Sequence, residues 1–310
     1  MCGWRPLDLE DVIPVAYSRE GLIVRENVEF NALDGTVLSG FFYTPETGRG
    51  PFPAIVLSHG FGAVKEMALG LYVDIFCDAG FACLAYDHRN TGSSGGPLRG
   101  EINPWEQISD MRDAITYIGN REEVNTDQIG LWGTSFAGGH SLVVAATDRR
   151  VKCVVSVVPT ISGHQNTIRA LTTNGYADFI RDANEERSAR QRGEEPRMIP
   201  ISSEGDESYE WSKIAGAGTT YVNSCTLLSR SFRDSYEPGS YIATVSPTPL
   251  LMVLGTHDTK CLTDLQLEAY SAAHEPKRLK MFPGGHYDPY TTELESIASA
   301  SSDWFEMHLK

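Results

Sequence analysis

Basic residues and paired cysteines are scarce in this sequence. Lys and Arg total 26 against 41 Asp and Glu, which gives the 310-residue chain a formal net charge of −15. Such a chain repels a phosphate backbone, so nucleic acid is excluded as a partner. The cysteines form no CxxC pair, which argues against a zinc site or a disulfide framework and predicts reduced, buried thiols. The six are Cys2, Cys77, Cys83, Cys153, Cys225 and Cys261.

Long apolar runs and targeting signals are also missing. No stretch is long enough to span a bilayer, so no membrane contact is expected. The segment from Met1 to Glu20 has acids and Pro14 where a secretory signal has basic and apolar residues, and the terminal His308-Leu309-Lys310 is not a peroxisomal ending. We therefore expect a cytoplasmic protein. No GxGxxG or P-loop motif occurs, so neither a cofactor nor a metal ion is predicted.

What the sequence does contain is a regular alternation of strand and helix patterns. Hydrophobic residues make up 41% of the chain, which is enough for a sizeable core. A hairpin around Asp34-Gly35 is followed by apolar runs that alternate with helical spacing, a pattern typical of a mostly parallel sheet with helices on both faces. The expected elements are strands at 53–58, 81–86, 129–134, 151–158, 249–254 and 278–282 and helices at 65–79, 104–117, 136–146, 262–273 and 292–308.

The alternation breaks after the fourth of these strands. From Gly163 to about Val245 a charged stretch and scattered aromatic residues replace it, which predicts an inserted helical cap. The predicted division is a core at 1–162 and 246–310 and a cap or lid at 163–245.

A serine stands between a predicted strand and a predicted helix. Ser135 lies within Gly133-Thr134-Ser135-Phe136-Ala137-Gly138-Gly139, which resembles the GxSxG nucleophile elbow except for alanine at the last position. Small neighbours let the strand and helix approach closely while the serine projects over the sheet. A helix N-cap serine is the structural alternative. We predict that Ser135 is a catalytic nucleophile.

A carboxylate and a histidine follow in the order that such a nucleophile needs. Asp258 comes after the strand that ends near Gly255, and His286 comes after the last strand. A serine hydroxyl needs an imidazole to take its proton, and the imidazole needs a carboxylate to fix its tautomer. We predict Asp258 and His286 as the catalytic acid and base. The competing residues nearby are His257, Asp264 and Asp288.

The reaction also needs amide donors for the oxyanion. The amide of Phe136, directly after the nucleophile, is the predicted first donor. The loop His59-Gly60-Phe61-Gly62 supplies the second, with the amide of Phe61 preferred and Gly62 as the alternate, while His59 is expected to brace the loop. The glycine-rich loop containing Asp87 and Arg89 lacks a Walker lysine, so a structural role at the site's rim is favoured over phosphate binding.

Four segments together resemble one family of enzymes. SHGFGAVKE (58–66), YDHRNTGSSGG (86–96), LWGTSFAGGH (131–140) and PGGHYDPY (283–290) are similar to α/β-hydrolases of the fungal polyketide transferase and thiohydrolase family. More distantly, they resemble bacterial hydrolases related to dienelactone hydrolases and X-Pro dipeptidyl-peptidases. The resemblance implies an α/β-hydrolase fold and the same triad of Ser135, Asp258 and His286.

Three functions stay open at this point. The first is a serine hydrolase, that is, an esterase or thioesterase that releases a polyketide-type acyl chain through an acyl-Ser135 intermediate. The second is an acyltransferase that passes the acyl group to an alcohol. The third is a non-catalytic binding or accessory protein on the same fold. The expected partner is a small-molecule or carrier-bound acyl substrate, including one on a polyketide synthase acyl carrier domain, and a homodimer through Trp4 and Tyr17 stays open.

Overall fold

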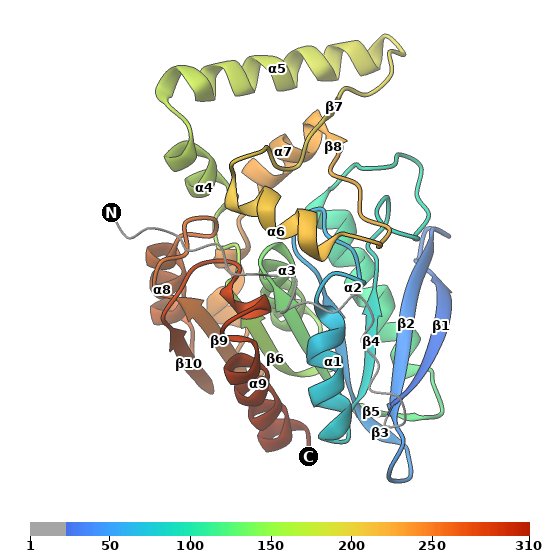
Figure 1. Ribbon diagram of the computed structural model, residues 1–310. Helices are drawn as coiled ribbons and strands as arrows, with labels where there is room; N and C mark the ends of the chain where they lie inside the picture. Colours follow the sequence, from blue (N-terminus) through green and yellow to red (C-terminus); the bar gives the residue numbers. More distant parts are fainter. Residues whose placement is uncertain (1–22) are drawn as a thin grey trace.

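The computed structural model describes residues 23–310, and its centre is one large, mostly parallel sheet (Figure 1). In the described part of the chain the sheet has eight strands in the order β1-β2-β4-β3-β5-β6-β9-β10. Their bounds are β1 Ile23–Asn31, β2 Val37–Pro45, β3 Phe52–Ser58, β4 Ala82–Tyr86, β5 Val124–Thr134, β6 Val151–Val157, β9 Leu250–Gly255 and β10 Lys277–Phe282. The α/β fold class predicted from the alternation is confirmed.

The antiparallel part of the sheet is the predicted hairpin at its edge. β1 pairs with β2 in a register that places Asn31 opposite Val37, and β2 pairs antiparallel with β4. Asp34 accepts the amide of Thr36 at 3.0 Å, and Gly35 has φ of +88°, which glycine adopts without strain. All other strand pairs in the sheet are parallel.

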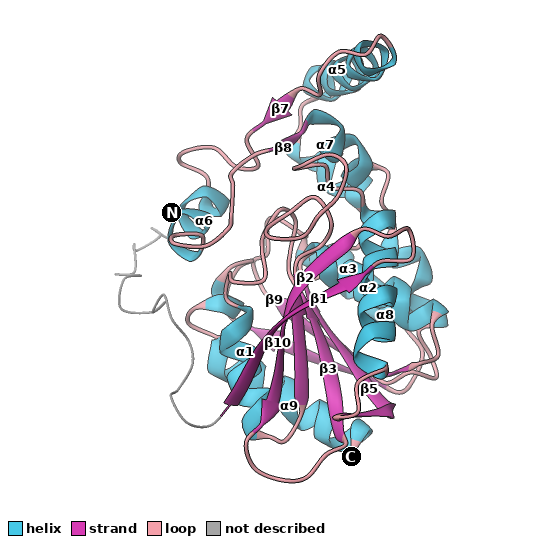
Figure 2. Ribbon diagram, turned by 90° about the vertical axis from the view of Figure 1, so that its right-hand side faces the viewer, coloured by secondary structure: helices cyan, strands magenta, loops and turns pink. Residues whose placement is uncertain are grey.

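Helices cover both faces of the sheet (Figure 2). One layer contains α1 (Leu69–Asp78) and α9 (Leu294–Leu309); the other contains α2 (Pro104–Gly119), α3 (Phe136–Thr147) and α8 (Thr263–Ala272). Adjacent residues of one strand serve the two layers: Leu131 packs in the α2–α3 layer, whereas Trp132 packs in the α1–α9 layer. The apolar runs of the sequence are therefore continuous because both faces of the strands are buried.

The first helix of the core begins later than the sequence predicts. The expected helix at 65–79 starts at Leu69 instead, because the amide of Lys65 donates to Asp87 at 2.7 Å and Ala68 has a left-handed φ of 64°. A carboxylate from a distant loop thus holds the first predicted turn in a non-helical conformation.

The segment 163–245 lies above the carboxyl ends of the strands, with α5 outermost (Figure 1). Helices dominate it, as expected, but it also contains a two-stranded sheet of β7 and β8, and η2 packs against α3 of the core. The division into core and cap at these boundaries stays a prediction. The elements are α4 Gly163–Ala170, α5 Thr173–Gln191, β7 Met198–Ile199, α6 Glu207–Ala215, β8 Cys225–Thr226, α7 Leu227–Asp234 and η2 Pro238–Thr244.

The structure tests the expectations about the cysteines and about membrane-spanning segments for the described residues only. Trp4, Tyr17 and Cys2 lie outside the described residues, whereas Cys77, Cys83, Cys153, Cys225 and Cys261 are free and buried, as predicted. Within residues 23–310, no helix combines the length and apolarity needed to cross a bilayer.

Candidate active site

Ser135 occupies the turn between β5 and α3. Its backbone has φ of 56° and ψ of −116°, a conformation that costs a non-glycine residue about 1–3 kcal/mol. Gly133 makes the turn possible, because a Cβ there would lie 2.3 Å from the carbonyl oxygen of Ala137 and 2.2 Å from Oγ of Ser141. Ala137, the departure from the usual elbow pattern, is fully buried within α3. The sharp strand-to-helix turn expected at Ser135 is present.

His286 and Asp258 form a hydrogen-bonded chain with Ser135. His286 Nε2 lies 2.9 Å from Ser135 Oγ, and its Nδ1 lies 2.8 Å from Asp258 Oδ2. All three side chains come from loops at the carboxyl ends of strands, since Asp258 follows β9 and His286 follows β10. The structure therefore brings the three predicted residues together in the predicted order.

Asp258 is held as a carboxylate. Its Oδ1 accepts the backbone amides of Lys260 at 2.8 Å and Cys261 at 2.9 Å, while Oδ2 also accepts from Gln266 at 3.2 Å. Burial alone raises the pKa of Asp258, but the charge and hydrogen bond of His286, together with the two amides, lower it below its ordinary value. An ionised Asp258 can orient His286 and stabilise its protonated form.

The competing residues have other contacts. Asp264 is exposed and forms an ion pair with Arg169 at 2.5 Å. Asp288 accepts the amide of Gly285 at 2.6 Å, which shapes the loop that carries His286. His257 directs its ring nitrogen to Thr256 at 2.7 Å. None of these contacts reaches Ser135.

The predicted oxyanion donors flank the serine. A Cβ at Gly60 would lie 3.1 Å from the Ser135 Cβ, so this loop packs directly against the nucleophile turn. The rings of Phe61 and Phe136 meet edge to face at 5.3 Å. Within residues 23–310 no acceptor is found for the amide of Phe61 or for that of Phe136, the first residue of α3. Their role as donors stays a prediction.

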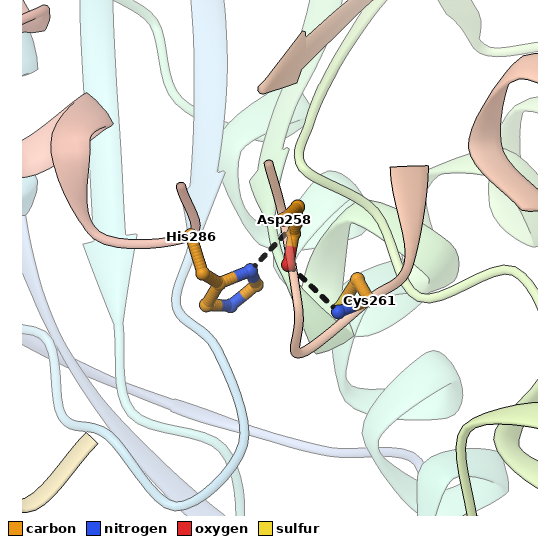
Figure 3. A group of neighbouring side chains, drawn as sticks. All are labelled: Asp258, Cys261 and His286. Atoms are coloured by element: carbon orange, nitrogen blue, oxygen red, sulfur yellow. Dashed lines mark hydrogen bonds and ion pairs between the residues drawn. The ribbon is translucent and has the colours of Figure 1, made fainter. Parts of the chain in front are cut away.

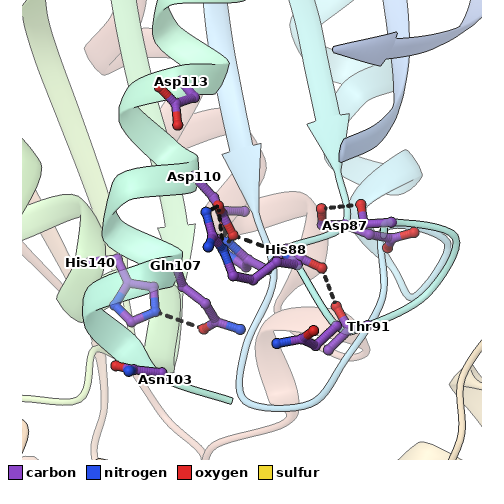
Figure 4. A network of polar contacts seen from close by, with 12 residues as sticks. Asp87, His88, Thr91, Asn103, Gln107, Asp110, Asp113 and His140 are labelled. Carbon is purple, nitrogen blue, oxygen red and sulfur yellow. Dashed lines mark hydrogen bonds and ion pairs between the residues drawn. The ribbon is translucent and has the colours of Figure 1, made fainter. Parts of the chain in front are cut away.

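A network of buried polar groups links the ends of β3 and β4 with α2 and α3 (Figure 4). His88 Nε2 lies 2.7 Å from Ser58 Oγ, and His140 bridges Gln107 and Tyr236. His59 contacts its own loop at Gly60 O, and burial together with the neighbouring His88 lowers its pKa to about 4. Burial likewise lowers the pKa of His140 well below its ordinary value, so His59 and His140 are neutral packing groups near neutral pH rather than proton carriers.

The glycine-rich loop after β4 is held in place by hydrogen bonds and ion pairs of Asp87 and Arg89. Asp87 binds the Lys65 ammonium at 2.6 Å and the Ser93 amide at 2.8 Å. Arg89 forms a bidentate contact with Asp110 and a further ion pair with Asp34. Carboxylates of the chain already engage the Ser93 amide and both cations, which favours the structural role.

Cys261 was not predicted to be near the nucleophile. Its Sγ lies 3.9 Å from Ser135 Oγ and 3.4 Å from Thr160 Oγ1. Burial, followed by the charge of Asp258, raises the pKa of the thiol to about 12, so it stays protonated. The only sequence signal was its position three residues after Asp258, on the same turn.

Asp258, Cys261 and His286 also form the group of described residues whose donor atoms could meet at one metal ion (Figure 3). Their candidate ligand atoms lie within 4.8 Å of one another. However, Asp258 Oδ2 and His286 Nδ1 are hydrogen-bonded to each other at 2.8 Å. This arrangement suits a carboxylate–imidazole pair better than an ion-binding site.

Ser135 and His286 line a cavity of about 360 Å³ between the ends of the strands and the segment 163–245. Trp211 of α6 forms part of its wall and stacks on Tyr287 with ring centroids 5.1 Å apart. An ion pair between Lys260 and Asp206 at 2.9 Å crosses from the acid loop to the cap. Ser135, Phe61, Phe136, Ile201, Arg233 and His286 also line this cavity.

The sheet order, the serine turn and the cap define a protein with the α/β-hydrolase fold. Residues 34–288 match the family model described as X-Pro dipeptidyl-peptidase (S15 family), and the chain belongs to this family. The polyketide transferase grgF of Penicillium sp. is 31% identical over 294 residues, covering 92% of this chain and 97% of that protein. The thiohydrolase aneE of Aspergillus aculeatus is 31% identical over 274 residues, covering 82% of this chain and 84% of its own.

Solved structures agree with this assignment. The crystal structure of the alpha/beta hydrolase GrgF from Penicillium sp. superposes with a TM-score of 0.81 at 31% identity, covering 92% of this chain and 99% of that chain. A hypothetical protein from Pseudomonas aeruginosa superposes with a TM-score of 0.83 at 27% identity, covering 96% and 100%. The predicted resemblance to the polyketide transferase and thiohydrolase family is confirmed, and the chain belongs among hydrolases and acyltransferases.

Proposed function

We propose that the protein is a serine hydrolase that cleaves a thioester or ester through an acyl-Ser135 intermediate, releasing a polyketide-type acyl chain. The observation that carries the proposal is the continuous hydrogen-bonded chain from Ser135 Oγ through His286 to Asp258. The relatives named thiohydrolase and polyketide transferase support the thioester as the substrate bond.

In the first half of the reaction, Ser135 Oγ attacks the acyl carbonyl carbon while His286 Nε2 takes the hydroxyl proton. The carbonyl oxygen becomes an oxyanion, which the amides of Phe61 and Phe136 stabilise. Collapse of the intermediate breaks the carbon–sulfur bond, and His286 returns the proton to the leaving thiolate. Asp258 stays ionised throughout, because its pKa is already lowered in the resting site.

In the second half, water enters where the thiol has left, loses a proton to His286 and attacks the acyl carbonyl carbon. Collapse of this second intermediate breaks the bond from the carbonyl carbon to Ser135 Oγ, and His286 gives the proton to Oγ. The released products are a carboxylic acid and the free serine. If an alcohol takes the place of water, the same residues transfer the acyl group and yield an ester. The relative named acyltransferase drtE, 31% identical over 268 residues, keeps this second outcome in view. The acyl donor is proposed to arrive as a small thioester or on an acyl carrier domain.

The test is intact-mass analysis after mixing the protein with a fluorophosphonate and, separately, with a reactive acyl thioester. The parent is expected to gain one adduct with each reagent, and Ser135→Ala is expected to gain none. Ser188→Ala is the matched control, since Ser188 is exposed on α5 and its hydroxyl donates to Asn184 O at 3.0 Å within the same helix. Folded parent protein without any adduct would favour the non-catalytic alternative.

The lifetime of the acyl adduct then separates the two enzyme functions. A hydrolase loses the adduct in water at a rate that added alcohols barely change. An acyltransferase loses it faster with an alcohol present, and the ester product appears in the same sample. His286→Ala should block adduct formation, whereas His257→Ala should not.

A further inference from the structure

Arg233, near the end of α7, is a charged group without a charged partner in the cavity of Ser135. Its guanidinium is partly buried and lines this cavity together with Phe61 and His286. Among residues 23–310, no carboxylate lies within ion-pair distance of Arg233, and its Nε has no hydrogen-bond partner. The guanidinium lies over the ring of Phe61, whose centroid is 5.2 Å from Cζ.

The acids around Arg233 are committed to other groups. Asp234, the next residue, contacts the Nδ1 of His164 at 3.4 Å and the hydroxyl of Tyr176 at 3.3 Å. Asp258 binds His286, and Asp206 binds Lys260. The cavity therefore contains a guanidinium whose hydrogen-bond donors lack an anionic acceptor from the described chain.

Such an arrangement is costly unless a ligand completes it. An arginine in a protein stays protonated, and removing a cation from water without a partner is unfavourable. The same chain shows the usual solution at Arg89, which is paired with both Asp110 and Asp34. Burial also lowers the pKa of Arg233 from its ordinary value. The contrast between the two arginines points to a substrate anion rather than to fold stability.

A second cavity meets the first at Arg233. It has a volume of about 360 Å³ and lies beneath α5, and both cavities share Phe61, Ala170, Ile201 and Arg233. Much of its wall is apolar, which suits the hydrocarbon part of an acyl chain. The apolar lining residues include Leu171, Phe179, Ile199, Ile201 and Leu227. Charged residues also line this cavity: Asp178, Asp182 and Arg197 form ion pairs, and Arg230 is exposed and donates to Pro200 O.

We propose that Arg233 is a specificity-determining residue that binds a carboxylate carried by the acyl chain of the substrate, with the chain extending from Ser135 toward the second cavity. This inference rests on the proposed function for the position of the reacting carbonyl. A carboxylate accepts two parallel hydrogen bonds from a guanidinium, which an alkyl chain cannot do. The enzyme therefore distinguishes dicarboxylic mono-thioesters from plain alkanoyl thioesters of equal length.

The experiment compares adipoyl with hexanoyl and suberoyl with octanoyl thioesters of N-acetylcysteamine, a leaving group without phosphate. The parent should favour the carboxylate-bearing member of at least one pair. Arg233→Met should lower kcat/KM for that member by about 10- to 100-fold, the usual range for a lost charge-assisted hydrogen bond, and change kcat/KM for the plain chain less than about threefold. Arg233→Lys should retain part of the preference.

Arg187→Gln is the matched control, because Arg187 is exposed on α5 and lines neither cavity. This substitution removes one positive charge from the cap, as Arg233→Met does. Arg187→Gln should leave kcat/KM unchanged for both members of each substrate pair. Thermal melting of Arg233→Met is the second readout. If Arg233 binds substrate and has no protein partner, Arg233→Met should have a Tm equal to or higher than that of the parent. If Arg233 is needed for the fold, the substitution should lower the Tm.

Three results would overturn the inference. These are equal losses with both members of a pair, no loss with either, and a loss confined to coenzyme A thioesters, which would assign Arg233 to a leaving-group phosphate. Failure of the proposed function looks different, because then the parent turns over no thioester and takes up no fluorophosphonate. In that case calorimetry of adipate monomethyl ester binding to Ser135→Ala, with and without Arg233→Met, still decides the role of Arg233.

Discussion

Replacing Asp258 with asparagine changes the hydrogen bonding of His286 while keeping the shape of the side chain. Two backbone amides, from Lys260 and Cys261, point at Oδ1 of Asp258. They should hold the asparagine carbonyl oxygen at that position and leave its NH₂ group facing His286 Nδ1. Nδ1 must then act as acceptor, so the ring proton moves to Nε2 and faces Ser135 Oγ. The histidine can no longer take the proton of the serine.

The expected loss in kcat is on the order of 10⁴-fold, about 5 kcal/mol of transition-state stabilisation, as for the wrong imidazole tautomer in other Ser-His-Asp enzymes. The assay is thioester turnover at pH 7 and above, together with the rate of fluorophosphonate labelling. Asp264→Asn is the control, since Asp264 forms an exposed ion pair with Arg169, and its activity should change less than about twofold. If Asp258→Asn remained within about tenfold of the parent, the triad assignment would be wrong.

The other predictions concern buried groups around the site. Because burial lowers the pKa of His59 to about 4 from 6.5, the unfolded chain binds a proton that the folded chain refuses, so the free energy of unfolding should fall as the pH drops from 6.5 toward 4. Urea titrations at several pH values check this, and His59→Gln should make the slope shallower. Gly133→Ala should abolish folded, active protein, since its Cβ would clash with Ala137 and Ser141, whereas Ala137→Gly should cost only about 1 kcal/mol in the same urea titration. Cys261→Ala should keep kcat within about threefold of the parent, because a thiol with a pKa of about 12 is not a nucleophile at neutral pH; a loss above about 100-fold would show otherwise.

The elbow was predictable from sequence because its requirements are local. The strand, Gly133, Ser135 and the following helix are contiguous, and each imposes a residue type that can be read directly. Asp258 and His286 could be proposed from chain order alone, since parallel strands deliver their following loops to the same edge of the sheet. Their hydrogen bonds with Ser135 required the structure.

Features set by distant contacts were not predictable. The start of α1 depends on Asp87, which lies 22 residues from Lys65 and accepts its amide. Arg233 belongs to a cap whose sequence has no motif, and its isolation depends on where Asp234, Asp206 and Asp258 direct their oxygens. The local sequence does not show which acids already bind another cation or hydrogen-bond donor, so an arginine without an acidic partner can be recognised only from the folded structure.

The segment 163–245 leaves the sheet after β6 and returns at β9, and these two strands are direct neighbours in the sheet. Because β6 and β9 are parallel, the segment leaves at the carboxyl end of β6 and returns to the amino end of β9, and it adds no strand to the eight-stranded sheet. A segment whose own strands form a separate sheet can lengthen, shorten or be exchanged without changing the register of the eight strands. Ser135 precedes this segment in the chain, and Asp258 and His286 follow it. The proposed catalytic residues and most of the residues proposed to select the acyl chain thus lie in separate stretches of the chain, so a cap exchanged between relatives should alter which chain is accepted while leaving the cleavage step intact.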